Sequence, residues 1–437
     1  MRSFLPSRGA AKGRTYDLAS LARRRAGMNR NWLLIALMVL LGVPAGILRI
    51  ADLAGGGVHL GPGLTVLIFG GGIIVAAFLI SWAGEAAQRD VSQTLALAFL
   101  ALIAVLPEYS VDLYLAWQAG QDPSGPYVHF ATANMTGANR LLLGLGWPLV
   151  AILFWFKRRR GLQLERGISL ELLFLAIAGL YALTIPFKGG IALWDGAVLM
   201  GLFCAYIWLS SKTEHLEPEL VGPAAVLGNL RTLRRRTVVA SLFVYCALII
   251  LASAEPFAEG LLEAGRGLGI DEFIMIQWVA PLASETPEIL IAVIFALRGQ
   301  AAAAGSVLIS AMVNQWTLLI GSLPVVYSLS LGDLTLKGLP LDARQAEEVW
   351  LTAAQGVFGV VLLLRRSVGA LAGATLLLMW ASQLAVTGAA ARWGYVGSYL
   401  GFGMVLLVFD RTRLRSAGRL VPEVLDIFRR PKEERHE

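Results

Sequence analysis

Long hydrophobic segments, separated by short polar ones, follow one another along almost the whole chain. Each has about the twenty apolar residues that cross the hydrocarbon core of a bilayer as an α-helix. They are expected at residues 31–50, 62–87, 93–118, 128–157, 168–187, 190–211, 236–257, 272–298, 302–330, 348–364, 368–389 and 394–409. The pattern therefore predicts an all-α, polytopic membrane protein with about twelve transmembrane helices.

Composition agrees with a membrane protein and narrows its partners. Hydrophobic residues make up 57% of the chain and charged residues 15%, whereas about a quarter of a soluble domain is charged. The net charge of +7 comes mostly from short basic clusters that border hydrophobic segments, which is typical of topology signals and not of nucleic-acid binding. Cys204 and Cys246 lie in apolar runs, so no disulfide framework, thiolate metal site or other cofactor is expected.

Lysine and arginine are concentrated in alternate connections, as they are on the cytoplasmic side of membrane proteins. The basic connections contain Arg89, residues 157–160 with Arg166, Arg231 with residues 234–236, Arg298, Arg365 and Arg366, and Arg411, Arg413 and Arg415. The connections between them, such as residues 118–127 and 331–347, hold few basic residues. We therefore expect an integral protein of the plasma (inner) membrane with both termini in the cytoplasm.

Two Pro-Glu pairs, Pro107-Glu108 and Pro287-Glu288, lie inside predicted spans that cross the membrane in opposite directions. The halves are therefore expected to be inverted repeats of five helices each, which commonly hold substrate where they meet near the midplane. The expected parts are a basic N-terminus (1–30), an extra helix (31–50), the first repeat (62–211), a cytoplasmic linker (212–235), the second repeat (236–389), another extra helix (394–409) and a cytoplasmic tail (410–437).

Carboxylates accompany both Pro-Glu pairs. Asp112 lies one helical turn beyond Glu108, and Glu285 lies within about one turn of Glu288, so each pair can share a helix face. Charges at this depth are costly, and they usually face a cavity and have a function. Each proline frees a backbone carbonyl that can also face the cavity. Because Glu285 and Glu288 repel unless a cation or proton lies between them, the pair could exchange a proton for a metal ion.

The segment after each Pro-Glu pair supplies neutral oxygens. The first contains Asn134 and Asn139, and in the second Ser306, Ser310 and Asn314 recur every four residues. Lone amides and hydroxyls in membrane helices are more often interhelical contacts than ligands. The complete candidate cation site is Glu108, Glu288, Glu285, Ser284, Asn134, Asn139, Asn314, Ser310 and Asp112.

These two-helix units resemble the alpha repeats of the cation/calcium exchanger superfamily. That family has Gly-Thr-Ser-x-Pro-Glu followed by Gly-Asn-x-x-Gly-Ser-Asn, and here the second part reads Ala133-Asn134-Met-Thr-Gly137-Ala138-Asn139. The resemblance covers residues 62–389 approximately. It implies that Glu108 and Glu288 are paired central ligands, that Ser284 is a hydroxyl ligand and that Asn134 is an amide ligand.

This chain departs from the family pattern at three places. Ala104-Val105 replaces the Thr-Ser pair of the first repeat, Glu285 replaces the serine before the second Pro-Glu, and Ile309 occupies the position that matches Asn134. Calcium prefers six to eight oxygens, so the first repeat is too poor in side-chain oxygens for several such sites. A single principal cation site with a titratable partner is expected.

The resemblance therefore implies a secondary active antiporter and not an enzyme. It would exchange calcium or sodium against sodium or protons by alternating access. Its partners are inorganic cations and the lipid bilayer, and no oligomeric state is predicted. A passive cation channel is the nearest alternative, because the same acidic groups could conduct ions. An intramembrane hydrolase has less support, since the four histidines lie in loops or at segment ends and no His-Glu-x-x-His motif is present.

Overall fold

The computed structural model describes residues 18–56, 60–90, 105–164, 166–212, 220, 222–334, 337–385 and 388–429. Several predicted features lie partly outside these ranges: the basic N-terminus, the first half of the span at residues 93–118, the linker at residues 212–235 and the end of the C-terminal tail. Within the described ranges the chain is helical apart from two very short sheets.

The first half of the chain is built mostly from long helices. Its elements are α1 (Leu18–Leu53), α2 (Pro62–Ala87), α4 (Leu106–Gln121), α5 (Tyr127–Leu141), the π-helical segment η1 (Leu142–Gly146), α6 (Trp147–Arg158), β1 (Leu162–Gln163), η2 (Arg166–Ile168), α7 (Ser169–Ala182), η3 (Ile185–Lys188), β2 (Gly190–Ile191) and α8 (Leu193–Ser210).

The second half follows the same plan and adds a helix pair at its end. Its elements are α9 (Pro223–Gly228), α10 (Thr232–Leu268), α11 (Glu272–Ile274), the π-helical segment η4 (Met275–Val279), α12 (Ala280–Arg298), α13 (Ala301–Asn314), the π-helical segment η5 (Gln315–Leu319), α14 (Ile320–Leu331), β3 (Leu339–Pro340), α15 (Ala343–Leu363), β4 (Ser367–Val368), α16 (Ala370–Leu384), α17 (Ala389–Phe409) and α18 (Arg411–Arg429).

Local sequence explains where several helices begin and end. Gly269, Gly299 and Gly332 follow α10, α12 and α14 with φ of 68°, 85° and 70°, a left-handed conformation that ends helices and suits glycine. Asp342 caps α15, because its side chain accepts a hydrogen bond from the backbone N–H of Gln345, whose side chain bonds back to Asp342.

The helices are apolar enough to confirm a polytopic membrane protein. In the part of the chain that the structure describes, nine helical runs could cross a membrane, or ten if the bent pair α17–α18 is one span. The expected number of twelve is not confirmed. From the span at residues 93–118 only residues 105–118 are described, and nearly all of these belong to α4. Helix α16 has 15 residues, which at 1.5 Å per residue is shorter than a hydrocarbon core of about 30 Å.

A bend of 93° separates α17 from α18. Asp410 lies between the two helices with extended backbone, and its side chain accepts a hydrogen bond from the backbone N–H of Thr412 at 3.0 Å. Just beyond the bend, Nε of Arg413 donates to the carbonyl of Val361 in α15 at 3.1 Å. The expected tail at residues 410–437 therefore contains a helix that packs on the protein.

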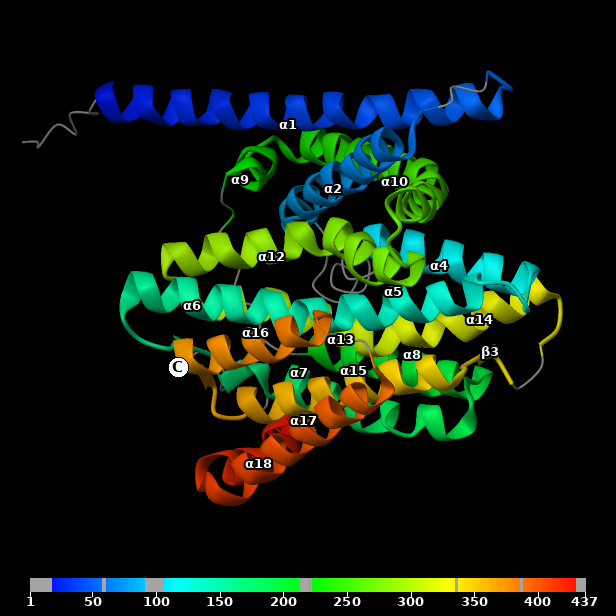
Figure 1. Cartoon of the computed structure of the whole chain (residues 1–437). Helices are drawn as coiled ribbons and strands as arrows, with labels where there is room; N and C mark the ends of the chain where they lie inside the picture. The colour runs from blue at the N-terminus through cyan, green and yellow to red at the C-terminus, as the bar shows by residue number, and fades with distance from the viewer. Residues whose placement is uncertain are drawn as a thin grey trace, which may run out of the picture.

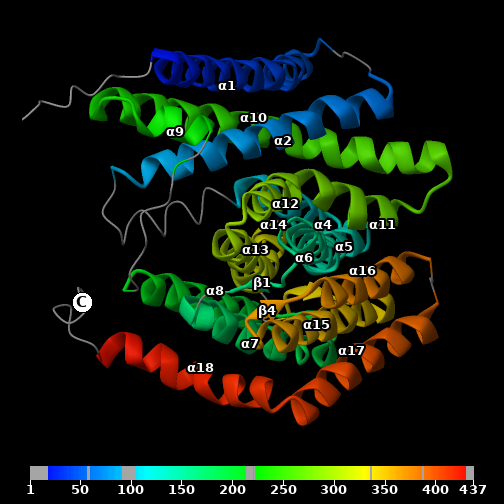
Figure 2. The same ribbon diagram turned by 90° about the vertical axis from the view of Figure 1, so that its left-hand side faces the viewer.

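The helices form three groups (Figures 1 and 2). Helices α1, α2 and α10 contact one another on one side. Helices α7, α8, α15, α16 and α17 lie on the opposite side, and α4, α5, α6, α12, α13 and α14 lie between the two groups. The middle group contains every helix that carries a candidate site residue.

The two halves have matching elements. Helices α5 and α6 flank a five-residue π-helical segment, and so do α13 and α14. The antiparallel strand pairs join opposite halves, β1 with β4 and β2 with β3. Strand β1 follows α6 as β3 follows α14, and β2 follows α7 as β4 follows α15. A twofold rotation that superimposes one half on the other would therefore exchange the β1–β4 pair with the β2–β3 pair. This arrangement supports internal duplication, and the opposite orientation of the halves in a membrane stays a prediction.

Candidate functional site

Carboxylates from both halves come together in the middle group of helices. Glu108 and Asp112 of α4 are 7% and 0% exposed, Glu285 of α12 is 2% exposed, and Glu288 of α12 is half-buried. Glu108 is close enough to the other three to interact with each of them electrostatically. The predicted convergence of the two Pro-Glu segments is therefore present in the structure.

Glu108 and Glu285 are neighbours whose carboxyl groups lie within hydrogen-bonding reach of each other. An ionised carboxylate can only accept hydrogen bonds, so such a bond requires a proton on one of the two groups. Like charges at this separation favour a shared proton. The sequence paired Glu108 with Glu288 as central ligands, and the structure adds Glu285 as a direct neighbour of Glu108.

The two prolines lie at different places in their helices. Pro287 is inside α12, where its missing N–H leaves the carbonyl of Ala283 without its helical donor. Pro107 lies in the first turn of α4. The carbonyl that it would free belongs to residue 103, which lies outside the described residues, so the expectation of a freed carbonyl in the first repeat stays a prediction.

Side-chain amides surround the acidic groups. Nε2 of Gln315 in η5 donates to Oε1 of Glu285 at 2.6 Å, and the amide of Asn134 in α5 lies beside Asp112. Within the described ranges, several buried oxygens have no hydrogen-bond donor: Oε1 of Glu108, both carboxylate oxygens of Asp112, Oε2 of Glu288, Oδ1 of Asn134, Asn139 and Asn314, and Oε1 of Gln315. Buried acceptors without donors are costly, and oxygens are the ligands that hard cations prefer.

The oxygens do not form a compact metal cage. Among the residues that the structure describes, no group of three or more His, Cys, Asp and Glu side chains is arranged to hold a metal ion. A cation bound here would draw the carboxylates closer together and would need amide oxygens as further ligands.

Three predicted ligands have hydrogen bonds of their own. Oγ of Ser284 donates to the carbonyl of Pro281 at 3.2 Å, and Nδ2 of Asn139 donates to the carbonyl of Met135 at 3.0 Å. Both residues keep oxygen lone pairs for a ligand. Ser310 is hydrogen-bonded to Tyr206 of α8, so it makes an interhelical contact, as lone hydroxyls in membrane helices commonly do.

Sequence reasoning left two features out of the site. Gln315 directly follows Asn314, and its contact with Glu285 depends on how α13 and α12 pack. Arg140 directly follows Asn139 and forms a buried ion pair with Glu348 of α15. The sequence did contain one indication of this pair, because an arginine inside the predicted span at residues 128–157 requires an acidic partner.

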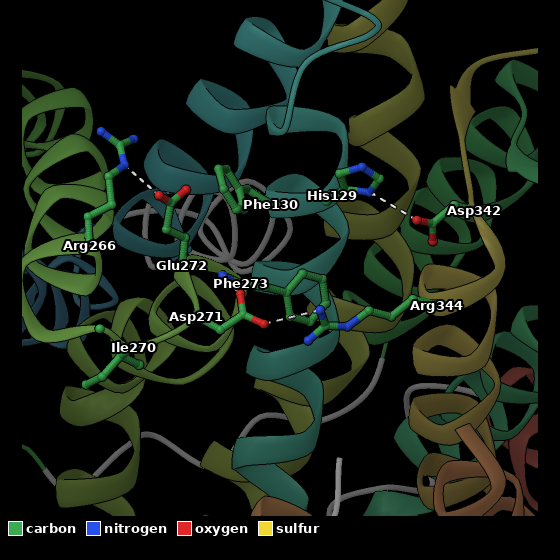
Figure 3. A pocket seen from close by; sticks show the side chains of 10 residues that line it. His129, Phe130, Arg266, Ile270, Asp271, Glu272, Phe273, Asp342 and Arg344 are labelled. Carbon is green, nitrogen blue, oxygen red and sulfur yellow. Dashed lines mark hydrogen bonds and ion pairs between the residues drawn. The ribbon is translucent and has the colours of Figure 1, made fainter. Parts of the chain in front are cut away.

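A separate cavity of about 570 Å³ lies where α5 and α15 begin and where α10 connects to α11. Figure 3 shows charged side chains around it, including ion pairs between Arg266 and Glu272 at 2.5 Å and between Arg344 and Asp271 at 3.3 Å. His129 lies 3.4 Å from Asp342. None of the predicted cation ligands lines this cavity.

Comparisons with known proteins show which family the chain is similar to. The model of the sodium/calcium exchanger protein family matches residues 60–212 and 238–388. The solved structure of the H+/Ca2+ exchanger CAX is 42% identical, and the similarity covers 92% of this chain and 99% of that chain with a TM-score of 0.86. A comparison with curated proteins found no match.

Two further matches are more distant, and the YfkE structure shares the fold. The structure of YfkE is 14% identical, with 84% of this chain and 99% of that chain covered and a TM-score of 0.57. The sodium-calcium exchanger NCX_Mj is 16% identical, with 80% and 100% covered and a TM-score of 0.49.

Proposed function

The chain belongs to the sodium/calcium exchanger family of cation antiporters, and from this membership we propose that it exchanges calcium for protons. Exchange takes place by alternating access at the site between α4, α5, α12 and α13. The principal ligands are Glu108 and Glu288, Glu285 is the proton-binding partner, and Asp112, Ser284, Asn134, Asn139 and Asn314 supply further oxygens. The membrane is the plasma (inner) membrane, with both termini in the cytoplasm.

The neighbouring carboxyl groups of Glu108 and Glu285 carry this proposal. A proton stabilises the pair when no cation is bound. A bound divalent cation also neutralises the negative charge of the two carboxylates, so its binding releases the proton. The two states exclude each other because both use the same carboxylate oxygens, which is the requirement for coupled exchange.

The choice of calcium and protons over sodium rests on two observations. The solved H+/Ca2+ exchanger CAX is 42% identical over 92% of this chain. In addition, Glu285 places a carboxylate where the family pattern has a serine hydroxyl, and a carboxylate can bind a proton at a site where a hydroxyl can only coordinate.

Countertransport in proteoliposomes tests the proposal. With the purified protein in the membrane, an imposed proton gradient should drive calcium uphill, and sodium or potassium gradients of the same size should not. We expect Glu108→Gln and Glu288→Gln to reduce this exchange by about 100-fold or more, because each removes a charged ligand from a low-dielectric site.

Glu171→Gln is the matched control, since it removes a half-buried carboxyl from α7 outside the proposed site and should keep most of the activity. Calcium flux that only runs downhill would identify a channel. Uphill flux that both Pro-Glu variants retain would contradict the assignment of the site.

A further inference from the structure

A second set of buried charges lies beside the proposed site. Arg140 of α5 and Glu348 of α15 are 2% and 5% exposed, and Nη2 of Arg140 lies 2.6 Å from Oε2 of Glu348. Arg140 directly follows Asn139, and α5 also carries Asn134. Charged residues inside membrane helices are rare and usually serve a function, and this pair has no role in the exchange described above.

Gln277 of η4 connects the ion pair to the helix run that continues into α12. Its Nε2 donates to Oε2 of Glu348 at 3.2 Å and lies 3.4 Å from Oγ1 of Thr136 in α5. The backbones are also close at this point, because a Cβ at Gly137 would lie 1.7 Å from the carbonyl oxygen of Gln277. The run of α11, η4 and α12 is therefore held against α5 by both backbone and side-chain contacts.

Other groups complete the surroundings of Arg140. Its guanidinium carbon lies 4.9 Å from the centre of the Trp278 ring, where a cation–π interaction is favourable. Nε2 of Gln355 in α15 donates to the Arg140 carbonyl at 3.3 Å. Tyr399 of α17 is close enough to interact with Arg140 electrostatically. Among the described residues, Tyr399 is thus the further ionisable group shown to face the pair.

A buried charge pair differs physically from a set of acids without basic partners. Arg140 neutralises Glu348 through a covalently attached cation that cannot leave. Glu108, Asp112 and Glu285 have no hydrogen bond or ion pair to a basic side chain within the described residues, so their charge must be balanced by ions that come and go. Breaking a buried pair from one side leaves an uncompensated charge, whereas removing both members does not.

We propose that Arg140 is the permanent counter-cation of Glu348, and that the pair, together with Gln277, is a positioning element that holds α5, with its candidate ligands Asn134 and Asn139, against α12. This inference rests on the proposed exchange site, since it assigns the pair a role in the geometry of that site. The pair itself does not bind the transported ion. It keeps Glu348 from competing for that ion, and it sets the distance between α5 and α12.

A double-mutant cycle tests the inference. Proton-driven calcium uptake is measured for Arg140→Gln, Glu348→Gln and the double variant in proteoliposomes, with apparent KM and maximal rate determined separately. Each single change should raise the KM for calcium about tenfold, because one unpaired charge displaces α5. The double variant should return to within about threefold of the wild-type KM, since the coupling between neighbouring residues is non-additive.

The split between KM and maximal rate separates positioning from general structural damage. Misfolded protein lowers the maximal rate by reducing the number of active molecules and leaves KM unchanged. A single variant with unchanged KM, or a double variant as impaired in KM as the worse single variant, would overturn the inference.

If the glutamine variants do not fold, Gln277→Met and Arg140→Lys decide the question. Gln277→Met removes the bridge and leaves both charges in place, and Arg140→Lys keeps the charge while losing the planar guanidinium. Raised KM with a preserved amount of folded protein supports the inference in either variant, and wild-type KM in both overturns it. A wild-type protein without exchange activity would instead contradict the proposed function.

Discussion

Carboxylates in this protein have different partners, and the partner decides the role of each one. Glu348 is paired with Arg140, and Asp90 is paired with Arg235. Glu108 and Glu285 instead have each other as neighbours. An acid with a basic partner joins helices, whereas two acids side by side must bind a proton or a cation.

Asp90 follows α2 and shows the structural role of an acid outside the membrane. Nε and Nη2 of Arg235 donate to its two carboxylate oxygens at 2.6 and 2.7 Å, which joins the end of α2 to the first turn of α10. These charge-assisted bonds hold the pKa of Asp90 below its usual value. The stabilisation from this pair is therefore fully present above about pH 3.9, the ordinary pKa of aspartate, and is lost as pH falls toward the lowered pKa.

Asp90→Asn should lower the melting temperature by roughly 3–6 °C at neutral pH, because it removes charged hydrogen bonds. The difference from wild type should stay constant between about pH 7 and pH 5 and shrink below about pH 4. Thermal unfolding of both proteins in detergent across this range checks it. A difference that already disappears at pH 6 would show that Asp90 is not the group responsible.

Individual acids were predictable from sequence, but their partners were not. A glutamate after a proline within an apolar span is easily identified from the sequence. Asp112 and Glu285 are then found because each lies about one helical turn from such a glutamate. The contacts of Glu285 with Glu108 and of Arg140 with Glu348 join residues that are 177 and 208 positions apart in the chain. Such contacts depend on how helices pack, and spacing within one helix does not determine that.

At the scale of elements, α5 is the helix on which both proposals depend. It carries Asn134 beside Asp112 and Arg140 beside Glu348, and it contacts η4, α4, α12 and α15. Its Gly137 allows the close approach of the Gln277 backbone. A side chain at residue 137 would push α5 away from η4 and from α12, which continues η4.

Gly137→Ala should therefore reduce stability and exchange together. A Cβ placed 1.7 Å from the Gln277 carbonyl oxygen forces the backbone to move, and such overpacking costs about 1–3 kcal/mol or more. Gly146→Ala is the matched control, since its Cβ would meet its nearest neighbours at 3.5 Å, an ordinary contact distance. Melting temperature and calcium uptake of the two variants check the prediction. Equal behaviour of the two would contradict it.

The existence of the helices was more predictable than their breaks. Hydrophobic length located most spans to within a few residues, because a membrane requires long apolar helices. The bend between α17 and α18 and the π-helical segments η1, η4 and η5 were not expected. At the bend, Asp410 accepts a local hydrogen bond from Thr412, and Arg413 contacts α15; the second contact comes from helix packing, which local sequence does not reveal. The π-helical segments have no distinct local pattern in hydrophobicity.

For the whole molecule, the paired halves support the proposal that one site serves both sides of a membrane. Acids from α4 and α12 meet between two units whose strands pair reciprocally. The charge alternation of the connections predicted two units of opposite orientation. The site between α4 and α12 forms only when the two halves pack together. The sequence indicated this packing only through the positions of the two Pro-Glu pairs.

Counting the protons released when calcium binds is the most direct test of the account. Calcium is titrated into the purified protein in buffers of different ionisation enthalpy, which gives the number of protons released per calcium ion. We predict release of about one proton or more per calcium, because cation and proton use the same carboxylates, and greatly weakened calcium binding in Glu108→Gln and Glu288→Gln. Calcium binding without proton release, or binding that neither substitution affects, would contradict the shared site.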